Sequence, residues 1–256
     1  SKKKNIVSNL PDGADCLAAA ELCDHFSKIL IILRDDVRLS RFSQSLRIIT
    51  NNIDIIEFPA WDCLPFDKNS PNQKLVGKRV RALSSLANPN SKKTIILSTI
   101  GSVIQKIPNQ DFIKNSSKSI QSGQNISQRE LINFFENNGY MRTNTVREDS
   151  EYSLRGSILD VYPPGEKHPV RIDFFGDVID SLRLFDPISQ LSLHNINFIS
   201  FNAGNEIILT DHSVELFRRN HRELFNEEYD KSLYSNISQK IRTNGIEHYL
   251  SMFHES

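Results

Sequence analysis

Cysteine is scarce in this sequence of 256 residues, and its sparse pattern argues against two classes of protein. The three cysteines, Cys16, Cys23 and Cys63, are odd in number and show no CxxC spacing. The disulfide framework of a small secreted protein needs paired cysteines, and a structural zinc site needs ligands at short, regular spacing. The sequence therefore predicts neither a disulfide-rich domain nor a zinc-binding one.

Two further absences concern membranes and nucleic acids. No stretch approaches the roughly 20 apolar residues of a membrane-spanning helix, and no apolar run follows the lysines of the N-terminal SKKKNIVSNLPDG to form a signal peptide. Lysine and arginine together number 31, as do aspartate and glutamate, so the formal net charge is zero. Proteins that wrap nucleic acid usually carry a basic excess. We therefore expect a cytoplasmic protein with no membrane partner and no dominant nucleic-acid surface.

Helical and extended patterns alternate along the first hundred residues. Helices are predicted at residues 14–26, 38–49 and 73–86, and strands at residues 29–33, 54–58 and 94–99. The run 29–33 is wholly apolar, as expected for a strand buried on both faces. Alternating units of this kind predict a mostly parallel sheet covered by helices.

The pattern changes in the second half of the chain. Residues 106–126 are rich in Ser, Asn and Gln and predict a linker or a crossing between domains. Ser127 and Glu130 then have the spacing of a capping box at the start of a short helix. Residues 155–201 predict successive short strands in an antiparallel β-rich domain, and residues 210–225 predict a helix.

An α/β start invites a search for a phosphate-binding loop at the entry to its first helix. Such a loop needs glycines for close backbone approach and a lysine for the phosphates. The chain has Asp12, Gly13, Ala14 and Asp15 at this place. No lysine follows the glycine, and two carboxylates lie where phosphate would bind. We therefore predict a degenerate phosphate loop without bound cofactor, and we identify no catalytic residue and no metal-ligand spacing among the seven histidines.

Two segments stand out from this background. The first, FPAWDCLPFDKNSPNQ, follows a predicted strand and offers Trp61 and Phe66 as possible loop contacts. Anchoring of both rings to the core is the slightly favoured alternative.

The second segment spans residues 154–186. Along residues 170–175, apolar residues alternate with Arg171, Asp173 and Phe175. An arginine beside an exposed aromatic ring is typical of protein–protein hot spots. Equally, Phe175 could pack against a helix while Arg171 pairs with Asp173.

Several motifs occur in the order found in one family. The run RGSILDVYPPGEKHPVRIDFFGDVIDSLRLFDPISQLSL resembles the second domain of bacterial transcription-repair coupling factors. The segments WDCLPFDKNSPNQKLVGKRVRAL, LTDHSVELFRRNHRELF and GIEHYLSMF are similar to other parts of the same N-terminal module. The resemblance covers nearly the whole chain.

The resemblance implies a fold like that of component B of the nucleotide-excision-repair excinuclease, with domains 1A, 2 and 1B. Domain 1A would span residues 1–120, domain 2 residues 121–200, and a truncated domain 1B residues 201–256. The implied fold class is a degenerate P-loop/RecA-like parallel α/β domain plus a small antiparallel β-rich α+β domain. The ATP- and magnesium-dependent motor of the family would lie beyond Ser256.

The resemblance also implies a function, which is to recruit component A of the excinuclease to stalled RNA polymerase in transcription-coupled repair. The family's contact residues fall on Arg155, Arg171 and Phe175. RNA polymerase and duplex DNA would be partners only of the full-length protein, and this part would not be an enzyme.

Residual affinity for nucleotide or duplex DNA is the alternative function. Nucleotide affinity would have to arise in domain 1A despite the missing lysine. The candidate basic residues for duplex binding are Lys78, Arg79, Arg81, Arg218, Arg219 and Arg222. Because the net charge is zero, we expect both clusters on solvated helix faces.

Overall fold

The computed structural model describes residues 6–11, 13–64, 67–87, 93–225 and 231–254. The chain divides into two compact units. The first comprises Ser1–Ala60 and Pro89–Gln105, and the second comprises Trp61–Asn88 and Lys106–Ser256.

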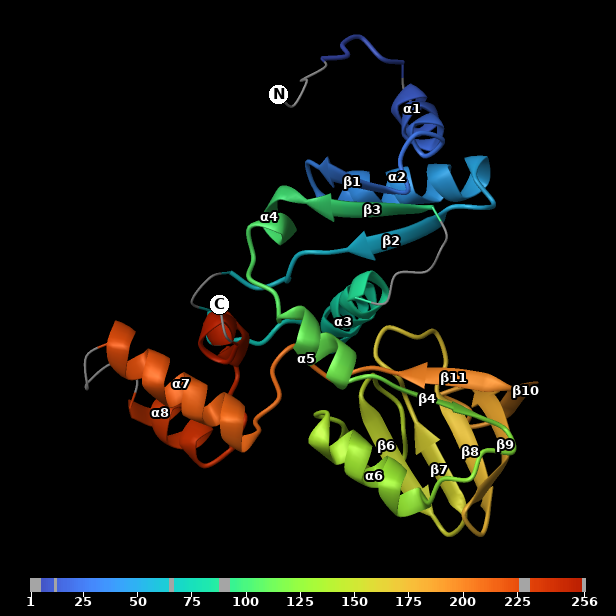
Figure 1. The fold of residues 1–256 in the computed structure, drawn as a ribbon, viewed down its shortest axis with the longest axis vertical. Coiled ribbons are helices and arrows are strands. Elements are labelled where there is room, and N and C mark those ends of the chain that lie inside the picture. Colours follow the sequence, from blue (N-terminus) through green and yellow to red (C-terminus); the bar gives the residue numbers. More distant parts are fainter. Residues whose placement is uncertain (1–5, 12, 65–66, 88–92, 226–230, 255–256) are drawn as a thin grey trace. The chain divides into compact units, whose positions relative to one another are not determined.

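The first unit is a parallel α/β layer (Figure 1). Its helices are α1 (Ala14–Leu22), α2 (Asp36–Ile49) and α4 (Ile100–Val103), and its strands are β1 (Lys28–Leu33), β2 (Asp54–Phe58) and β3 (Thr94–Thr99). The strand order is β1-β3-β2 with every pairing parallel, so the predicted parallel sheet is confirmed. Leu39, Phe42 and Leu46 of α2 pack with Ile95 and Leu97 of the central strand.

The prediction that residues 29–33 are buried on both faces is wrong. Ile29, Ile31 and Leu33 pack against α1 and α2, but Leu30 and Ile32 are 54% and 50% exposed. The reason is that β1 lies at the edge of the sheet, whereas β3, with neighbours on both sides, is the largely buried strand.

The second unit is built around an antiparallel sheet, which confirms the predicted β-rich domain. Its strands are β4 (Lys118–Gln121), β5 (Met141–Arg142), β6 (Glu151–Arg155), β7 (Ile158–Val161), β8 (Val170–Phe175), β9 (Val178–Phe185), β10 (Ser192–Ile196) and β11 (Phe198–Phe201). Strands β5 to β10 form one sheet in sequence order, with only the β5–β6 pair parallel. Strands β4 and β11 form a separate antiparallel ribbon.

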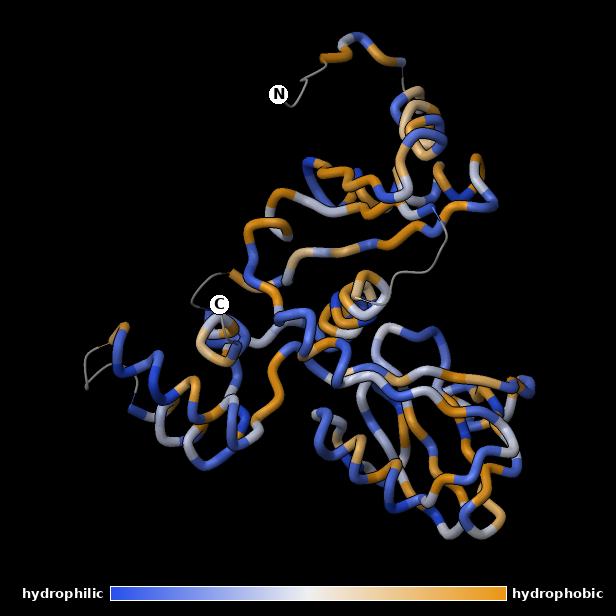
Figure 2. Tube along the Cα trace, viewed as in Figure 1, coloured by the Kyte–Doolittle hydropathy of each residue, from blue (hydrophilic) through white to orange (hydrophobic). Residues whose placement is uncertain are grey.

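Helix α6 (Gln128–Asn137) covers one face of this sheet. The other helices of the second unit are α3 (Gln73–Ala87), α5 (Gln110–Asn115), α7 (Asp211–Leu224), α8 (Lys231–Ser238) and the 3-10 helix η1 (Ile246–Met252). Leu131 and Phe135 of α6 pack on Ile172 and Leu182 of the sheet. Figure 2 shows the apolar and polar residues alternating along these strands. Half of the predicted capping box is present: the hydroxyl of Ser127 caps α6 by accepting the Glu130 N–H at 3.1 Å, whereas the Glu130 carboxylate pairs with Lys118.

The segment expected to be a linker, residues 106–126, is folded. It contains α5 and β4, and it buries Ile113 and Ile120 in the second unit. A polar composition hid these elements because each is short and contributes only one or two core residues. The predicted helix at residues 210–225 is confirmed as α7, whose Phe217 stacks on Phe253.

Helix α3 meets the sheet through two glycines. A Cβ atom on Gly77 would lie 2.6 Å from the backbone nitrogen of Gly165 and 2.5 Å from a carboxylate oxygen of Asp149. The helix backbone therefore touches the Pro163-Pro164-Gly165 turn directly. Gly77 lies inside the helix predicted at residues 73–86, and the close packing explains why this position is a glycine.

Candidate functional site

The face of the six-stranded sheet opposite α6, called the outer face below, carries a row of charges. Arg171, Asp173 and Phe175 of β8 lie on it, as the alternation predicted. The antiparallel register sets Arg171 between Asp160 of β7 and Arg183 of β9. Cross-strand neighbours on one face have Cβ atoms about 5 Å apart, so their side chains can pair.

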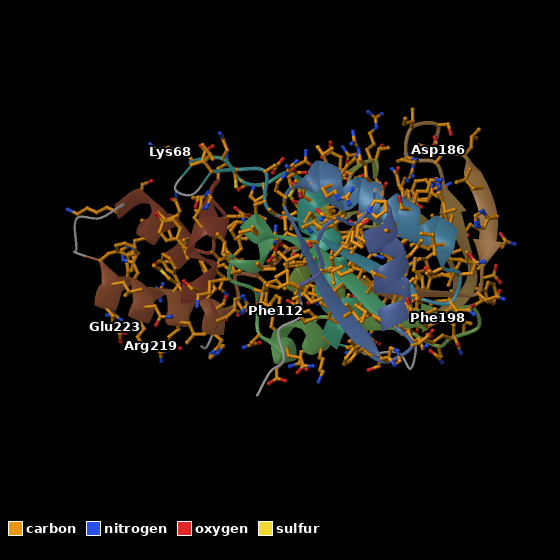
Figure 3. The ribbon with its side chains drawn as sticks, turned by 90° about the horizontal axis from the view of Figure 1, so that it is seen from above. Lys68, Phe112, Asp186, Phe198, Arg219 and Glu223 are labelled. Carbon is orange, nitrogen blue, oxygen red and sulfur yellow. The ribbon has the colours of Figure 1, made fainter. Side chains whose placement is uncertain are left out.

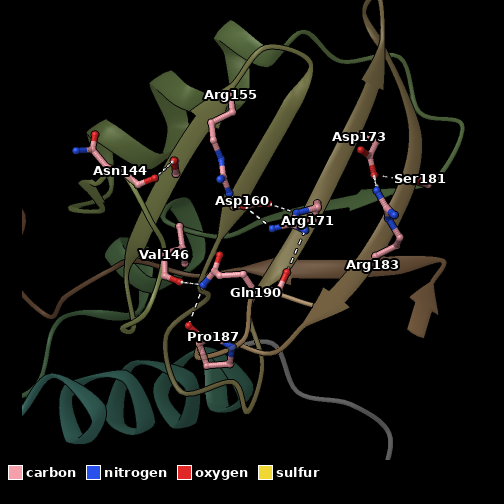
Figure 4. Close-up of polar contacts among 11 residues, drawn as sticks. Asn144, Val146, Arg155, Asp160, Arg171, Asp173, Ser181, Arg183, Pro187 and Gln190 are labelled. Atoms are coloured by element: carbon pink, nitrogen blue, oxygen red, sulfur yellow. Dashed lines mark hydrogen bonds and ion pairs between the residues drawn. The ribbon is translucent and has the colours of Figure 1, made fainter. Parts of the chain in front are cut away.

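Asp160 is the centre of this row. Its side chain is fully buried, and Arg171 donates to both carboxylate oxygens, from Nε at 2.7 Å and from Nη2 at 2.9 Å. Arg155 of β6 donates to Oδ2 from its own Nη2 at 2.7 Å (Figure 4). A buried carboxylate is costly unless it is paired and hydrogen-bonded. The flanking strands meet that condition by each bringing one arginine to Asp160.

Arg171 is held on all sides. Its Nη1 donates to the carbonyl oxygen of Gln190 at 3.4 Å, and its guanidinium carbon lies 4.7 Å from the ring centroid of Phe185. The side chain is 15% exposed. The hydrogen bond to Asp160 raises the pKa of Arg171, because the carboxylate favours the charged guanidinium. Arg171 is therefore a fixed cation inside the sheet surface.

Asp173 has a different partner from the one considered above. Its Oδ2 accepts Nη2 of Arg183 at 2.5 Å, Nε of Arg183 at 3.1 Å and the Ser181 hydroxyl at 2.9 Å. The alternative in which Arg171 pairs with Asp173 is therefore wrong. The guanidinium of Arg183 is partly exposed beside this pair.

Phe175 projects into solvent at the end of β8. It is 83% exposed, faces Val178 across the strand pair and precedes Gly176, whose positive φ of 61° makes the turn. The alternative in which its ring packs against a helix is wrong for the described residues. A large exposed ring therefore lies on the face that also carries the arginines.

The segment after β9 covers one end of the outer face. Gln190 donates to the carbonyl oxygen of Val146 at 3.0 Å (Figure 4), and Val146 packs with Tyr162 and Phe185. The side chains of Arg155, Arg183 and Phe175 remain accessible. Sequence reasoning missed Asp160 and Arg183. The hairpin register, counted from the turns at residues 163–165 and 176–177, was the signal that could have placed them beside Arg171.

The candidate phosphate loop lies at the start of α1. Gly13 caps the helix with φ 86°, and the carboxylate of Asp15 accepts the Cys16 N–H at 3.0 Å and pairs with Arg38. Ala14 is the first helical residue. Asp12 lies outside the described residues. The helix N-terminus is thus occupied by the chain's own carboxylate, and the P-loop/RecA-like character of this unit stays a prediction.

Trp61 is anchored inside the second unit. Its ring nitrogen donates to Glu206 at 3.1 Å, and the guanidinium of Arg79 lies 5.1 Å from its ring centroid. The anchoring alternative is therefore confirmed for Trp61. Phe66 lies outside the described residues.

The expectation that Arg79 lies on a solvated helix face is wrong. Arg79 is fully buried, and its Nε and Nη2 donate to the two carboxylate oxygens of Glu206 at 2.6 and 3.1 Å. Arg81 donates to the carbonyl oxygen of Gly165 and pairs with Glu166. On α7, Arg219 is exposed (Figure 3). Burial of Arg79 removes the central cation from the first basic cluster.

Membrane-spanning helices and metal sites are both missing from the described part of the chain. No helix there is long and apolar enough to cross a membrane. No group of three or more His, Cys, Asp or Glu residues there could hold a metal ion.

Comparison with known proteins identifies the class of domain to which the outer face belongs. Residues 119–206, which include Arg155, Arg171 and Phe175, match the family model of the UvrB interaction domain. The second unit therefore contains a domain of this class.

The whole chain has relatives among longer proteins. It is 32% identical over 251 residues to the transcription-repair-coupling factor of Haemophilus influenzae and 27% identical over 253 residues to that of Escherichia coli K12. These alignments cover 97% and 98% of this chain but 22% of each relative. The factor of Rickettsia bellii is 28% identical over 229 residues. The chain thus spans about a fifth of the length of these relatives. The predicted resemblance is confirmed, and the chain is homologous over nearly its whole length to the transcription-repair-coupling factors.

Proposed function

We propose that this chain is a non-catalytic adaptor that recruits component A of the excinuclease in transcription-coupled nucleotide excision repair. The matched UvrB interaction domain and the coupling-factor relatives support a role in this repair pathway. In the full-length protein, recruitment would bring the excinuclease to a stalled RNA polymerase. Contacts with polymerase and duplex DNA, and ATP-driven movement, would belong to the remaining four fifths of such a protein.

The observation that carries the proposal is the exposure of Phe175 on the same face of the sheet as the paired arginines Arg155, Arg171 and Arg183. Aromatic rings and arginines are enriched among the residues that dominate protein–protein affinity. A ring that is 83% exposed in the free chain has apolar area to bury on a partner. The proposed binding surface is the outer face with Arg155, Arg171 and Phe175.

Binding of purified excinuclease component A to the 256-residue chain tests the proposal. Phe175→Ala and Arg171→Ala are each expected to weaken binding by about 2 kcal/mol or more. Phe198→Ala is the matched control, because Phe198 is also exposed (58%) but lies on β11, in the other sheet (Figure 3). Calorimetric titration would measure all four proteins. Undiminished affinity in both outer-face variants would refute the proposed surface.

A further inference from the structure

The three arginines of the outer face differ in how many donors they have left. Arg171 uses Nε, Nη1 and Nη2 within the chain. Arg155 bonds Asp160 through Nη2 alone in the described part of the chain, and its side chain is 53% exposed. Arg183 bonds Asp173 through Nε and Nη2, which leaves Nη1 without a described partner, and it is 35% exposed.

The paired groups at the centre of this face carry more positive than negative charge. Arg155, Arg171 and Arg183 lie beside two carboxylates, Asp160 and Asp173. Asp160 is fully buried and Arg171 is mostly buried. A partner can therefore form hydrogen bonds mainly with the two more exposed guanidiniums, those of Arg155 and Arg183. Such groups suit carboxylates on a partner, because a guanidinium bound on one edge can still donate from the other.

We propose that Arg183 is a further contact residue for the partner, that Arg155 and Arg183 both bind its carboxylates, and that Arg171 is a positioning residue. Arg171 holds Asp160, and Asp160 fixes Arg155. The partner surface would carry carboxylates beside an apolar pocket for Phe175. This inference rests on the proposed function, since it takes component A of the excinuclease as the occupant.

The roles predict different patterns of affinity loss. Arg183→Gln is expected to weaken binding of component A by about tenfold to a hundredfold, the range for a hydrogen bond between charged groups. It should also flatten the dependence of the dissociation constant on salt, which a purely structural residue would not do. Arg183→Lys keeps the charge and should lose less. Arg129→Gln is the control, because Arg129 is exposed on α6, which packs on the opposite face of the sheet.

The positioning role is tested by combining substitutions. If Arg171 acts through Arg155, Arg155→Gln and Arg171→Gln together should weaken binding little more than either does alone. Losses from Arg155→Gln and Arg183→Gln should instead add. Asp160→Asn makes the face more positive, so simple charge attraction predicts tighter binding to an acidic partner. If Asp160 instead acts by orienting Arg155 through their hydrogen bond, Asp160→Asn should weaken binding, and this is the result we expect.

The outcomes separate this inference from the proposed function. Failure of the unaltered chain to bind component A would refute both. Binding by the unaltered chain with no loss in Arg183→Gln would overturn the inference alone. Additive losses for Arg155 and Arg171, in variants whose thermal unfolding shows them folded, would overturn the positioning role, as would tighter binding by Asp160→Asn.

Discussion

Asp160 is a buried carboxylate that orients two arginines of the outer face. One carboxylate shared by two guanidiniums fixes the side chains of Arg155 and Arg171 in defined geometry. Side-chain order that exists before binding does not have to be produced during binding, so less conformational entropy is lost. The buried charge is therefore better understood as an organiser of the outer face than as a source of stability.

Removal of this charge should nevertheless destabilise the fold. Asp160→Ala is expected to lower the free energy of unfolding by about 3 kcal/mol, because it leaves the mostly buried Arg171 without its partner. Asp180→Ala, on an exposed residue of β9, should change it by less than about 0.5 kcal/mol. Urea denaturation followed by circular dichroism measures both. Equal stability of the two variants would contradict the account of Asp160.

Phe175 presents the opposite case, in which a large side chain contributes little to the fold. Because its ring is 83% exposed, truncation removes few intramolecular contacts. A loss of partner binding in Phe175→Ala can therefore be assigned to the missing ring and not to unfolding.

At the scale of elements, the contact between α3 and the turn after β7 depends on the absence of side chains. A Cβ atom on Gly165 would lie 2.7 Å from the carbonyl oxygen of Gly77, so there is no space for a side chain at either position. Gly165 also has φ 71°, which glycine adopts without strain.

This contact predicts an unusual response to alanine. Within a helix, Gly→Ala is ordinarily stabilising by up to about 1 kcal/mol. Gly77→Ala should instead destabilise by about 1–3 kcal/mol, since the new methyl group meets backbone atoms. Gly101→Ala is the control, because its nearest neighbour, the Cβ atom of Ala60, is 3.6 Å away. Thermal unfolding compares the two, and a stabilised Gly77→Ala would disprove the close packing.

The spacing of apolar residues predicted those elements in which one face is buried along the whole length. The alternation of β8 and the Ser127 cap were readable because local chemistry decides them. Leu30 and Ile32 misled, since an apolar run does not reveal that its strand lies at a sheet edge. Asp160 was missed because its pairing with Arg171 follows from the hairpin register and not from the pattern along one strand. Arg79 was misjudged because its partner, Glu206, comes from a distant part of the chain. Long-range pairing is not encoded in local spacing.

At the scale of the whole molecule, the stability of the second unit should depend on pH near neutrality. Burial lowers the pKa of His254, whose Nε2 lies 3.1 Å from the carbonyl oxygen of Glu206 and whose ring contacts Phe112. The folded state thus disfavours the charged imidazole. Its contribution is fully present above the unfolded pKa of about 6.5 and is lost as the pH falls below that value.

Melting temperatures between pH 7.5 and 5.5 would test this dependence. The unaltered chain is expected to lose stability as the pH falls, and His254→Gln should show a flatter profile. His212→Gln, on an exposed residue of α7, is the control and should keep the original slope. If all three profiles have the same slope, His254 is not the responsible group.

The buried pair of Arg79 and Glu206 has a consequence for the order of events during synthesis. The two residues are separated by 127 positions, so at ordinary translation rates the arginine emerges roughly 6 to 25 s before its carboxylate. Before Glu206 has emerged, α3 cannot pack as in the folded unit, because burying the Arg79 guanidinium without its carboxylate is too costly. The first unit, complete at Gln105, can fold on the ribosome during that interval. A nascent chain stalled shortly before Glu206 would then be resistant to protease in its first unit and open to cleavage near α3.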